Sequence, residues 1–388
     1  MKNLLIVHGG GPTAVINASL YGAVSEAKRR PDVGHIYAAI GGSGGLMEEK
    51  LRDLRDIPDE QLSLLLQTPG SAIGTSRDRL REAEYARIAE VIAKYEIDCV
   101  LMNGGNGTMD TCGKIYARCK ADGLDVKVMG IPKTMDNDIA VTDHSPGYGS
   151  AARYMAASVQ ELAADVQGLP IHVVIIEALG RNAGWVTAAS ALAHDGGVGP
   201  DLIYLPERPF SEEAFLRDVK ALIDKKGAVV VVVSEGLRDE KGEPVAEPTL
   251  TIGRDVYFGD VCGHLANLVQ QKLGYKARSE KPGLLGRASI AYQSAVDREE
   301  AILAGALACK AVLDGETGKM VAFKREEGSG YKVTPFLVPI EAVMLEEKKL
   351  PDHFINEAGN FVTPAFLDWA RPLIGDPLPK MITLRNDL

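Results

Sequence analysis

Short runs of apolar, largely β-branched residues recur along this chain, and several pass through a glycine-rich turn into a segment with helical periodicity. Continuous apolar strands that alternate with helices are typical of a parallel sheet buried on both faces. Ligands of such sheets bind at the carboxyl ends of the strands. We therefore predict an α/β fold with mainly parallel sheets and a ligand site formed by the turns. The five runs are residues 4–7, 99–102, 126–131, 173–176 and 229–233.

Chain length and the spacing of these runs predict two lobes. At roughly 100–200 residues per domain, a chain of 388 residues favours two domains. Residues 1–143 and 144–286 each contain an α/β pattern, and a further helical pattern follows at 299–313. Because no repeat, low-complexity tract or Pro/Gly/Ser linker separates the halves, we expect the lobes to be interlocked.

Composition argues against several classes of partner. A formal net charge of -10 does not suit a nucleic-acid-binding surface. No run approaches the ~20 apolar residues needed to span a membrane, and the N-terminal run meets glycines too early for a signal peptide. Five scattered cysteines without metal-ligand spacing are typical of a reduced, cytoplasmic protein. Cys112 and Cys119, seven positions apart on an expected helix, are predicted core residues.

Two glycine turns follow predicted strands, HGGGPTAVIN at residues 8–17 and GGNGT at 104–108. Backbone amides and the helix N-terminus at such turns can receive phosphate oxygens. The first turn has neither the dinucleotide G-x-G-x-x-G pattern nor the P-loop lysine. A tight turn that binds nothing is the alternative for each, but two such turns together favour a phosphate site. Asn106 and Thr108 add oxygen ligands suited to Mg²⁺.

The heptapeptide PKTMDND at residues 132–138 carries the densest set of polar groups. Phosphoryl transfer requires a base near the attacking hydroxyl, carboxylates for Mg²⁺ and positive charge near the transferring group. Asp136, Asp138 and Lys133 supply these three kinds of group, and Thr134 adds a hydroxyl. The alternative is a polar loop with an Asx turn.

Polar residues also follow the strands of the second half. The segment LGRNAG at 179–184 places an arginine between glycines, where it can stabilise phosphoryl charge. Glu235 can accept hydrogen bonds from sugar hydroxyls. Arg278 and Arg287, nine positions apart, could fork onto a phosphate. A capped helix start, a surface glutamate and two solvated arginines are the alternative interpretations.

Taken together, these segments resemble the phosphofructokinase family over most of the chain. The matching stretches occur in the family's order: GGGPTAVIN, GSAIGTSR, GGNGT, PKTMDND, TDHSPGYGSA, LGRNAGW, VVSEG and the spacing from Arg278 through LLGR to Asp297. The resemblance implies two Rossmann-like lobes, with a phosphoryl-donor lobe at 1–143 plus about 287–340. The sugar-phosphate lobe would be 144–286 plus about 341–388. It also implies Mg²⁺ as cofactor and a homodimer or homotetramer, since some sugar-phosphate contacts come from a neighbouring subunit.

Residue by residue, the resemblance makes Asp136 the base that deprotonates the sugar hydroxyl. Thr134, Arg181 and Lys133 would act on the transferring phosphoryl group, and Asp138 with Asn106 would hold Mg²⁺. The implied donor contacts are Gly10, Gly11, Arg77, Gly105, Gly107 and Thr108. The implied sugar-phosphate contacts are Thr134, Asp136, Leu179, Gly180, Arg181, Glu235, Arg278, Arg287 and His172.

The donor assignment rests on two positions that disagree. Relatives that use pyrophosphate typically carry Asp at the Gly107 position, which blocks the α-phosphate of ATP, and Lys at the Lys133 position. Here the lysine is present and the blocking Asp is absent. Because steric exclusion is harder to evade than a missing attraction, we expect ATP as the donor, with pyrophosphate as the alternative. Asn106 also stands where an acidic residue is usual.

The acceptor follows from the resemblance as fructose 6-phosphate, phosphorylated on its 1-hydroxyl to fructose 1,6-bisphosphate. His172 and Leu284 replace an arginine and a histidine of the usual phosphate site, and each lost contact costs roughly 1.5–3 kcal/mol. Sedoheptulose 7-phosphate or another ketose phosphate is therefore an alternative acceptor. Two other classes stay open: a catalytically silent binder of nucleotide and sugar phosphate, and a dinucleotide-dependent dehydrogenase, which the loop spacing disfavours.

Overall fold

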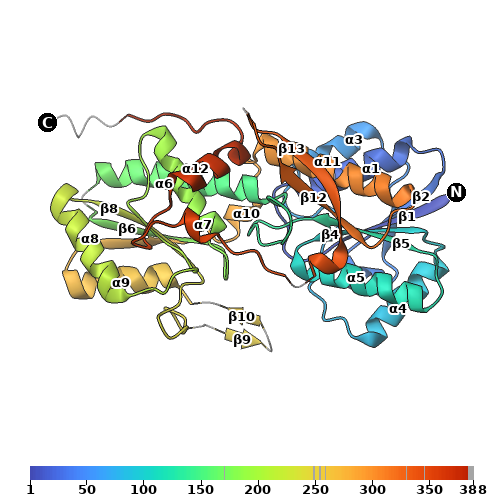
Figure 1. The fold of residues 1–388 in the computed structure, drawn as a ribbon, viewed down its shortest axis with the longest axis horizontal. Coiled ribbons are helices and arrows are strands. Elements are labelled where there is room, and N and C mark those ends of the chain that lie inside the picture. The colour runs from blue at the N-terminus through green and yellow to red at the C-terminus, as the bar shows by residue number, and fades with distance from the viewer. Residues whose placement is uncertain are drawn as a thin grey trace. The chain divides into compact units, whose positions relative to one another are not determined.

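The computed structural model describes residues 1–169, 171–247, 250–252, 255–257, 259–328, 330–344 and 346–382. They belong to two compact units, which we call unit 1 and unit 2 (Figure 1). Unit 1 is Met1–Tyr148 with Arg287–Lys348, and unit 2 is Gly149–Gly286 with Lys349–Leu388. The first boundary lies five residues and the last eight residues beyond those expected from the sequence, and the boundary between 286 and 287 coincides with the expected one. The predicted division into donor and sugar lobes stays a prediction.

Unit 1 contains a seven-stranded sheet with the order β13-β12-β5-β4-β1-β2-β3. Its five central strands are parallel, whereas β3 and β13 pair antiparallel at the two edges. The strands are β1 Lys2–His8, β2 Val33–Ala39, β3 Leu51–Asp53, β4 Cys99–Gly104, β5 Lys127–Pro132, β12 Lys319–Arg325 and β13 Val333–Pro339.

Helices cover both faces of this sheet, as the continuous apolar runs predicted (Figure 1). Leu4 and Ile6 of β1 pack into the core against α1 and α11, while Leu5 and Val7 point into the core against α4 and α5. Alternate residues of one strand thus fill two separate cores. The helices of unit 1 are α1 Ile16–Arg29, α2 Gly42–Met47, α3 Asp59–Ser63, α4 Glu82–Lys94, α5 Asn106–Ala121 and α11 Ala295–Leu313, with short 3₁₀ turns η1 Leu64–Gln67 and η3 Ile340–Ala342.

Unit 2 is built on a smaller, four-stranded parallel sheet with the order β11-β6-β8-β7. Its strands are β6 Val173–Ala178, β7 Leu202–Tyr204, β8 Val229–Ser234 and β11 Ala277–Glu280, and β9 Leu250–Ile252 pairs antiparallel with β10 Asp255–Tyr257. Helix α6 Tyr148–Gly168 leads into the unit and α10 Leu285–Ala288 leads out of it. The remaining elements are α7 Trp185–Ala189, η2 Ser190–Gly196, α8 Glu212–Lys226, α9 Val261–Leu273, η4 Asp352–Phe354, α12 Pro364–Ala370 and η5 Arg371–Ile374.

The α/β fold with mainly parallel sheets is confirmed, and the five predicted apolar runs lie in strands except for Val126, which directly precedes β5. All five cysteines are free and buried, and Cys112 and Cys119 are each only 1% exposed. Burial raises the pKa of the Cys112 thiol to about 12. Within the described ranges, no helix is long and apolar enough to cross a membrane.

Helices α1 and α11 approach so closely that glycine is required at their contact. A Cβ on Gly22 would lie 2.1 Å from the carbonyl oxygen of Ile302, and one on Gly305 would lie 1.9 Å from that of Ser19. Both neighbours are backbone atoms, which cannot rotate away. The helices can therefore pack in this way only while both positions lack a side chain.

We expect Gly22→Ala to lower the free energy of unfolding by about 1–3 kcal/mol, although alanine is the better helix former. The clash with Ile302 forces the two helices apart and opens the core behind them. Denaturant unfolding followed by circular dichroism measures the change. Gly168→Ala is the matched control, since a Cβ there meets nothing within 4 Å and should alter stability little. Equal stabilities of the two variants would contradict this account.

Candidate functional site

Three loops of unit 1 leave neighbouring strands at the same sheet edge. Strands β1, β4 and β5 are parallel and adjacent, so the residues after His8, Gly104 and Pro132 emerge side by side. These loops contain the two glycine turns and the heptapeptide that the sequence singled out. The sheet thus brings together most of the predicted donor and catalytic residues.

Glycines in the first two loops allow one buried threonine to pack between them. The Thr108 hydroxyl lies 2.3 Å from where a Cβ of Gly9 would be and 2.1 Å from where a Cβ of Gly104 would be. Thr108 itself is 7% exposed. Gly10 has a φ of 74°, a conformation that favours glycine. Any side chain at Gly9 or Gly104 would push the two loops apart.

A neutral histidine holds the first loop. His8 is fully buried, and burial lowers its pKa to about 3, with a smaller contribution from Lys133. Its Nδ1 contacts the Ser71 hydroxyl at 2.7 Å, and that hydroxyl donates to the carbonyl of Gly74. Nδ1 must therefore carry the proton, which leaves Nε2 as the acceptor facing the Asn103 amide at 3.4 Å. No local pattern in the sequence indicates the contact between His8 and Asn103.

The heptapeptide loop is braced by its own side chains. The Thr134 hydroxyl donates to the Asp138 carboxylate at 2.9 Å and accepts from the amide of Asp136 at 3.1 Å. Asn137 is fully buried and has a φ of 51°. Asp136 is half-buried and lies between Thr134 and Asn137 in the loop. The loop therefore presents one carboxylate in a defined position.

Asn106 and Asp138 offer oxygen ligands at the start of α5. The Asn106 amide donates to the Asp138 carboxylate at 3.0 Å and to its backbone carbonyl at 3.1 Å. In the described part of the chain, the Asn106 Oδ1 atom is buried without a hydrogen-bond partner. Carboxylate and amide oxygens are the ligands that Mg²⁺ prefers. The donor set therefore fits a single hard cation.

Three cations converge on Gly11. The Lys133 ammonium donates to the Gly11 carbonyl, and a Cβ on Gly11 would lie 2.6 Å from Arg287 Nη1 and 3.3 Å from Arg77 Nη2. Burial lowers the pKa of Lys133 to about 8; Asp136 opposes this shift, and both arginines add to it. Burial, followed by repulsion from Arg77, also lowers the pKa of Arg287. Positive charges held this close favour the binding of a polyanion.

The position of Arg287 differs from its expected grouping. The sequence assigned it to the sugar phosphate together with Arg278, but within unit 1 it lies against the predicted donor residues Gly11 and Arg77. Gly107 has open space around it, with nothing within 4 Å of a Cβ. Gly105 is the N-cap of α5.

Unit 2 brings a second group of predicted residues to the carboxyl ends of β6 and β8. The Glu235 carboxylate accepts from the Gly180 amide at 3.1 Å, and the Ser234 hydroxyl donates to the Gly180 carbonyl at 2.6 Å. Burial raises the pKa of Glu235, although the Gly180 amide opposes that shift. A Cβ on Gly236 would lie 1.8 Å from the Arg181 carbonyl, so these two loops also pack backbone to backbone. Leu179 directly follows β6 in the same loop as Arg181.

His172 and Arg278 are not brought to this edge of unit 2. His172 precedes β6, about 23 Å along the chain from Leu179 at ~3.3 Å per residue. Its Nδ1 accepts from the Lys276 amide at 3.3 Å, and its ring lies 5.3 Å from that of Tyr275. Arg278, on the edge strand β11, is exposed and pairs in register with Val174. Both residues thus lie toward the amino end of β6.

A further group of possible metal ligands in unit 2 is already satisfied by the protein. Among the described residues, Glu177, Asp260 and Cys262 form the one group of three or more His, Cys, Asp or Glu side chains that could share an ion. Lys281 pairs with Glu177 at 2.6 Å. Asp260 caps α9 by accepting from the Gly263 amide at 3.0 Å. These contacts identify a structural cluster.

Lys348 is a contributor to the loops that the sequence did not indicate. Its ammonium donates to the carbonyls of Thr142 and Asp143, both at 2.9 Å, and contacts Asn137 Oδ1 at 3.4 Å. Its backbone amide donates to the Asp138 carbonyl at 2.8 Å. Lys348 thus ties the heptapeptide loop to a segment far along the chain, which no local pattern reveals.

Comparison with known proteins gives one consistent result. A family model described as Phosphofructokinase matches residues 3–312. The chain is 37% identical to a pyrophosphate–fructose 6-phosphate 1-phosphotransferase of Xanthomonas campestris, over 99% of this chain and 96% of that protein. It is 34% identical to a sulfofructose kinase of Alkalicoccus urumqiensis, over 96% and 95% of the two chains. A solved pyrophosphate-dependent phosphofructokinase from Marinobacter aquaeolei superposes with a TM-score of 0.88 at 34% identity, covering 100% of this chain and 97% of that one.

We expect Asn106→Asp to couple the stability of unit 1 to Mg²⁺. The substitution replaces an amide that donates to Asp138 at 3.0 Å with a second carboxylate. Two carboxylates at this distance repel unless a cation lies between them. Thermal unfolding with and without Mg²⁺ should give a variant that is destabilised by about 1–3 kcal/mol in chelator and recovers with the ion. Gln61→Glu, an exposed change on α3, controls for added charge. A variant indifferent to Mg²⁺ would argue against a metal site here.

Proposed function

Because the chain belongs to the phosphofructokinase family, we propose that it transfers a phosphoryl group from pyrophosphate to the 1-hydroxyl of fructose 6-phosphate, with Mg²⁺ as cofactor. Fructose 1,6-bisphosphate and phosphate are the products. The sequence favoured ATP as the donor. The names of the most similar relatives support pyrophosphate instead, so we adopt the alternative.

The cation cluster at Gly11 is the observation that best supports this choice. Lys133, Arg77 and Arg287 gather at the glycine loop, next to the catalytic heptapeptide. Pyrophosphate consists of phosphate alone, so its whole recognition must come from cations and backbone amides. A buried lysine beside two arginines offers several cationic contacts, and such a set suits a donor made of phosphate alone better than one contact would.

Gly107 weighs less in this choice than the sequence suggested. The space around it would accept either a side chain or part of a larger donor. The absence of an aspartate there therefore permits ATP without favouring it. Lys133 is 4% exposed, and its ammonium donates to the Gly11 carbonyl of the first glycine loop. Lys133 is therefore the stronger criterion for the identity of the donor.

In the proposed mechanism, Asp136 takes the proton from the attacking hydroxyl. Lys133 and Arg287 both interact electrostatically with Asp136, so the proposed base lies beside two cations. Thr134, fixed by Asp138, lies beside the base and can orient the transferring group. Asp138 and Asn106 would hold Mg²⁺, which when bound neutralises charge on the phosphoryl oxygens.

The sugar-phosphate contacts are proposed from unit 2. Leu179, Gly180, Arg181 and Glu235 lie at the carboxyl ends of β6 and β8, where the Glu235 carboxylate accepts from the Gly180 amide. His172 and Arg278 lie toward the opposite end of β6, which suits residues that serve the site of a second copy of the chain. We therefore include a homo-oligomer in the proposal.

A donor-by-acceptor matrix tests the proposed function. Pyrophosphate and ATP are each combined with fructose 6-phosphate, sedoheptulose 7-phosphate and sulfofructose, the last because one relative is named a sulfofructose kinase. We expect turnover with pyrophosphate and fructose 6-phosphate, and a loss of about 10²–10⁴-fold in kcat for Asp136→Asn, which removes the base. Circular dichroism confirms that the variant is folded. Turnover with ATP alone, or full activity of the variant, would refute the assignment.

The activity should also depend on pH through Lys133. Its pKa in the folded protein is lowered to about 8, so the ammonium loses its charge as pH rises through that value. We expect kcat/KM for pyrophosphate to fall above about pH 8 in the wild-type protein. Lys133→Met should have a 10–100-fold lower kcat/KM, consistent with about 1.5–3 kcal/mol for a charged hydrogen bond, and should lack this decline. Because pyrophosphate titrates identically with both proteins, the difference between profiles isolates Lys133. Parallel profiles would contradict the role given to it.

A further inference from the structure

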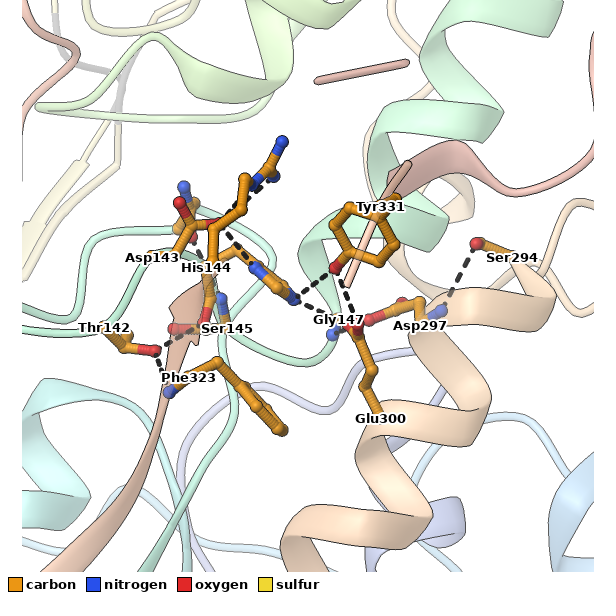
Figure 2. Close-up of polar contacts among 12 residues, drawn as sticks. Thr142, Asp143, His144, Ser145, Gly147, Ser294, Asp297, Glu300, Phe323 and Tyr331 are labelled. Atoms are coloured by element: carbon orange, nitrogen blue, oxygen red, sulfur yellow. Dashed lines mark hydrogen bonds and ion pairs between the residues drawn. The ribbon is translucent and has the colours of Figure 1, made fainter. Parts of the chain in front are cut away.

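A histidine of unit 1 lies between two carboxylates in the segment that follows the heptapeptide loop (Figure 2). His144 is 1% exposed. Its Nδ1 lies 2.8 Å from Asp143 Oδ2 and its Nε2 lies 2.6 Å from Glu300 Oε2. The ring stacks on Phe323 with centroids 5.5 Å apart and an interplanar angle of 8°. Three elements distant in sequence thus fix one imidazole ring.

This geometry favours the charged form of the ring. A neutral imidazole has one N–H, so it would leave one nitrogen lone pair facing a carboxylate oxygen, whereas an imidazolium donates to both. Tyr331 donates to the other oxygen of Glu300 at 2.6 Å, and Arg325 contacts Asp143 at 3.1 Å. Burial opposes the charge, but Asp143 and Glu300 outweigh it and raise the pKa of His144.

The residues directly after His144 are hydrogen-bonded to the heptapeptide loop. The Ser145 amide donates to Asn137 Oδ1 at 3.0 Å, and the Thr134 amide donates to the Pro146 carbonyl at 3.1 Å. Thr134 and Gly147 form an isolated parallel bridge. A shift of residues 145–147 would therefore move Thr134 and Asn137, which lie on either side of Asp136 in the loop.

Helix α11 holds the same segment at a second point. The Gly147 amide donates to Asp297 Oδ1 at 2.8 Å, and Asp297 lies one turn before Glu300 on this helix (Figure 2). At the other end, the Thr142 hydroxyl accepts from the Phe323 amide at 2.9 Å. Val141 has a φ of 69°, which is rare for a β-branched residue. Such a conformation persists only where its surroundings determine it.

We propose that His144 is a positioning residue for phosphoryl transfer: as an imidazolium bound to Asp143 and Glu300, it fixes residues 142–147 against α11 and β12 and thereby sets Thr134 and Asp136. The proposal rests on the proposed function, because it concerns the same loop. His144 touches no reacting atom. It acts through the backbone contacts of Ser145, Pro146 and Gly147.

The charged and titratable groups that face His144 come from every element around it. Asp143 lies on its own segment, Glu300 on α11, Arg325 on β12 and Tyr331 between β12 and β13. Burial, followed by the Glu300 carboxylate, raises the pKa of Tyr331, and arginine keeps its charge at all relevant pH values. Burial lowers the pKa of Lys348, which contacts the Asp143 carbonyl, to about 8. Lys348 therefore titrates in both proteins compared below and cancels in their difference.

The sign of the pH effect follows from the raised pKa. The tie formed by His144 is fully present below about pH 6.5, the ordinary pKa of histidine. It is lost as pH rises through the higher pKa of the folded protein. Both the stability contributed by His144 and its positioning effect must then decline on the alkaline side.

The kinetic test compares His144→Gln, which keeps a donor but carries no charge, with wild type between pH 6 and 9. We expect kcat to fall about 10–100-fold at pH 7, while KM for pyrophosphate and fructose 6-phosphate stays within threefold. The ratio of wild-type to variant kcat should shrink as pH rises. His35→Gln is the matched control, because His35 pairs with Asp53 at 2.6 Å on the exposed surface of the same unit. A kcat within twofold of wild type, or a ratio independent of pH, overturns the proposal.

Hydrogen–deuterium exchange of residues 133–147 tests the same tie without any substrate. Variant and wild type are compared at the same pH. At pH 6.5 the amides of this segment should exchange at least tenfold faster in His144→Gln than in wild type, and at pH 9 the difference should be smaller. Unchanged exchange overturns the proposal. If wild type lacks pyrophosphate-dependent activity, the proposed function fails, and this measurement still decides whether His144 holds the loop. If His144→Gln does not fold, Glu300→Gln replaces it, because the new amide can still contact Tyr331. In Glu300→Gln the exchange of residues 133–147 should begin to rise at a lower pH than in wild type. If it rises at the same pH, the proposed role of His144 is refuted.

Discussion

Parallel hydrogen bonding among β1, β4 and β5 is the constraint on which the rest of unit 1 depends. The register pairs Val7 with Met102 and Asn103 with Ile131, so the three strands end at nearly the same height. Everything that follows them must share a small region at one sheet edge. The glycines at positions 9 and 104 exist because Thr108 occupies that shared space. The heptapeptide loop leaves β5 in this same region, and the Thr134 hydroxyl accepts a hydrogen bond from the Asp136 amide there.

Two charged clusters of unit 1 use opposite principles. At Gly11, like charges are crowded together, and burial makes the charge on Lys133 costly until an anion arrives. Around His144, opposite charges alternate and satisfy one another within the protein. The first arrangement is suited to binding a ligand, and the second to holding a backbone still. They meet in the loop at 133–138, where Lys133 belongs to one and Thr134 is tied to the other.

The sequence was sufficient for elements whose pattern is local. Five strands with continuous apolar runs, the glycine turns and the polar heptapeptide were predictable, because each is defined by a few consecutive residues. The antiparallel edge strands β3 and β13 were not, since half-exposed strands lack such runs. The central strand β12 was also missed, although residues 320–323 are buried. Arg287 against Gly11 and His144 against Glu300 join residues far apart in the chain, and only the assembled core brings them together. No local pattern in the sequence indicates that hydrogen-bond donors and acceptors alternate around His144.

The burial of every cysteine has a practical consequence for studying this molecule. A thiol reacts as the thiolate, and burial raises the pKa of Cys99 to about 12 and that of Cys119 to about 11. Alkylating reagents should therefore modify the native chain only when a core opens. The rate of modification becomes a gauge of local unfolding, and a single cysteine introduced on the surface would accept a spectroscopic label without competition from the native thiols.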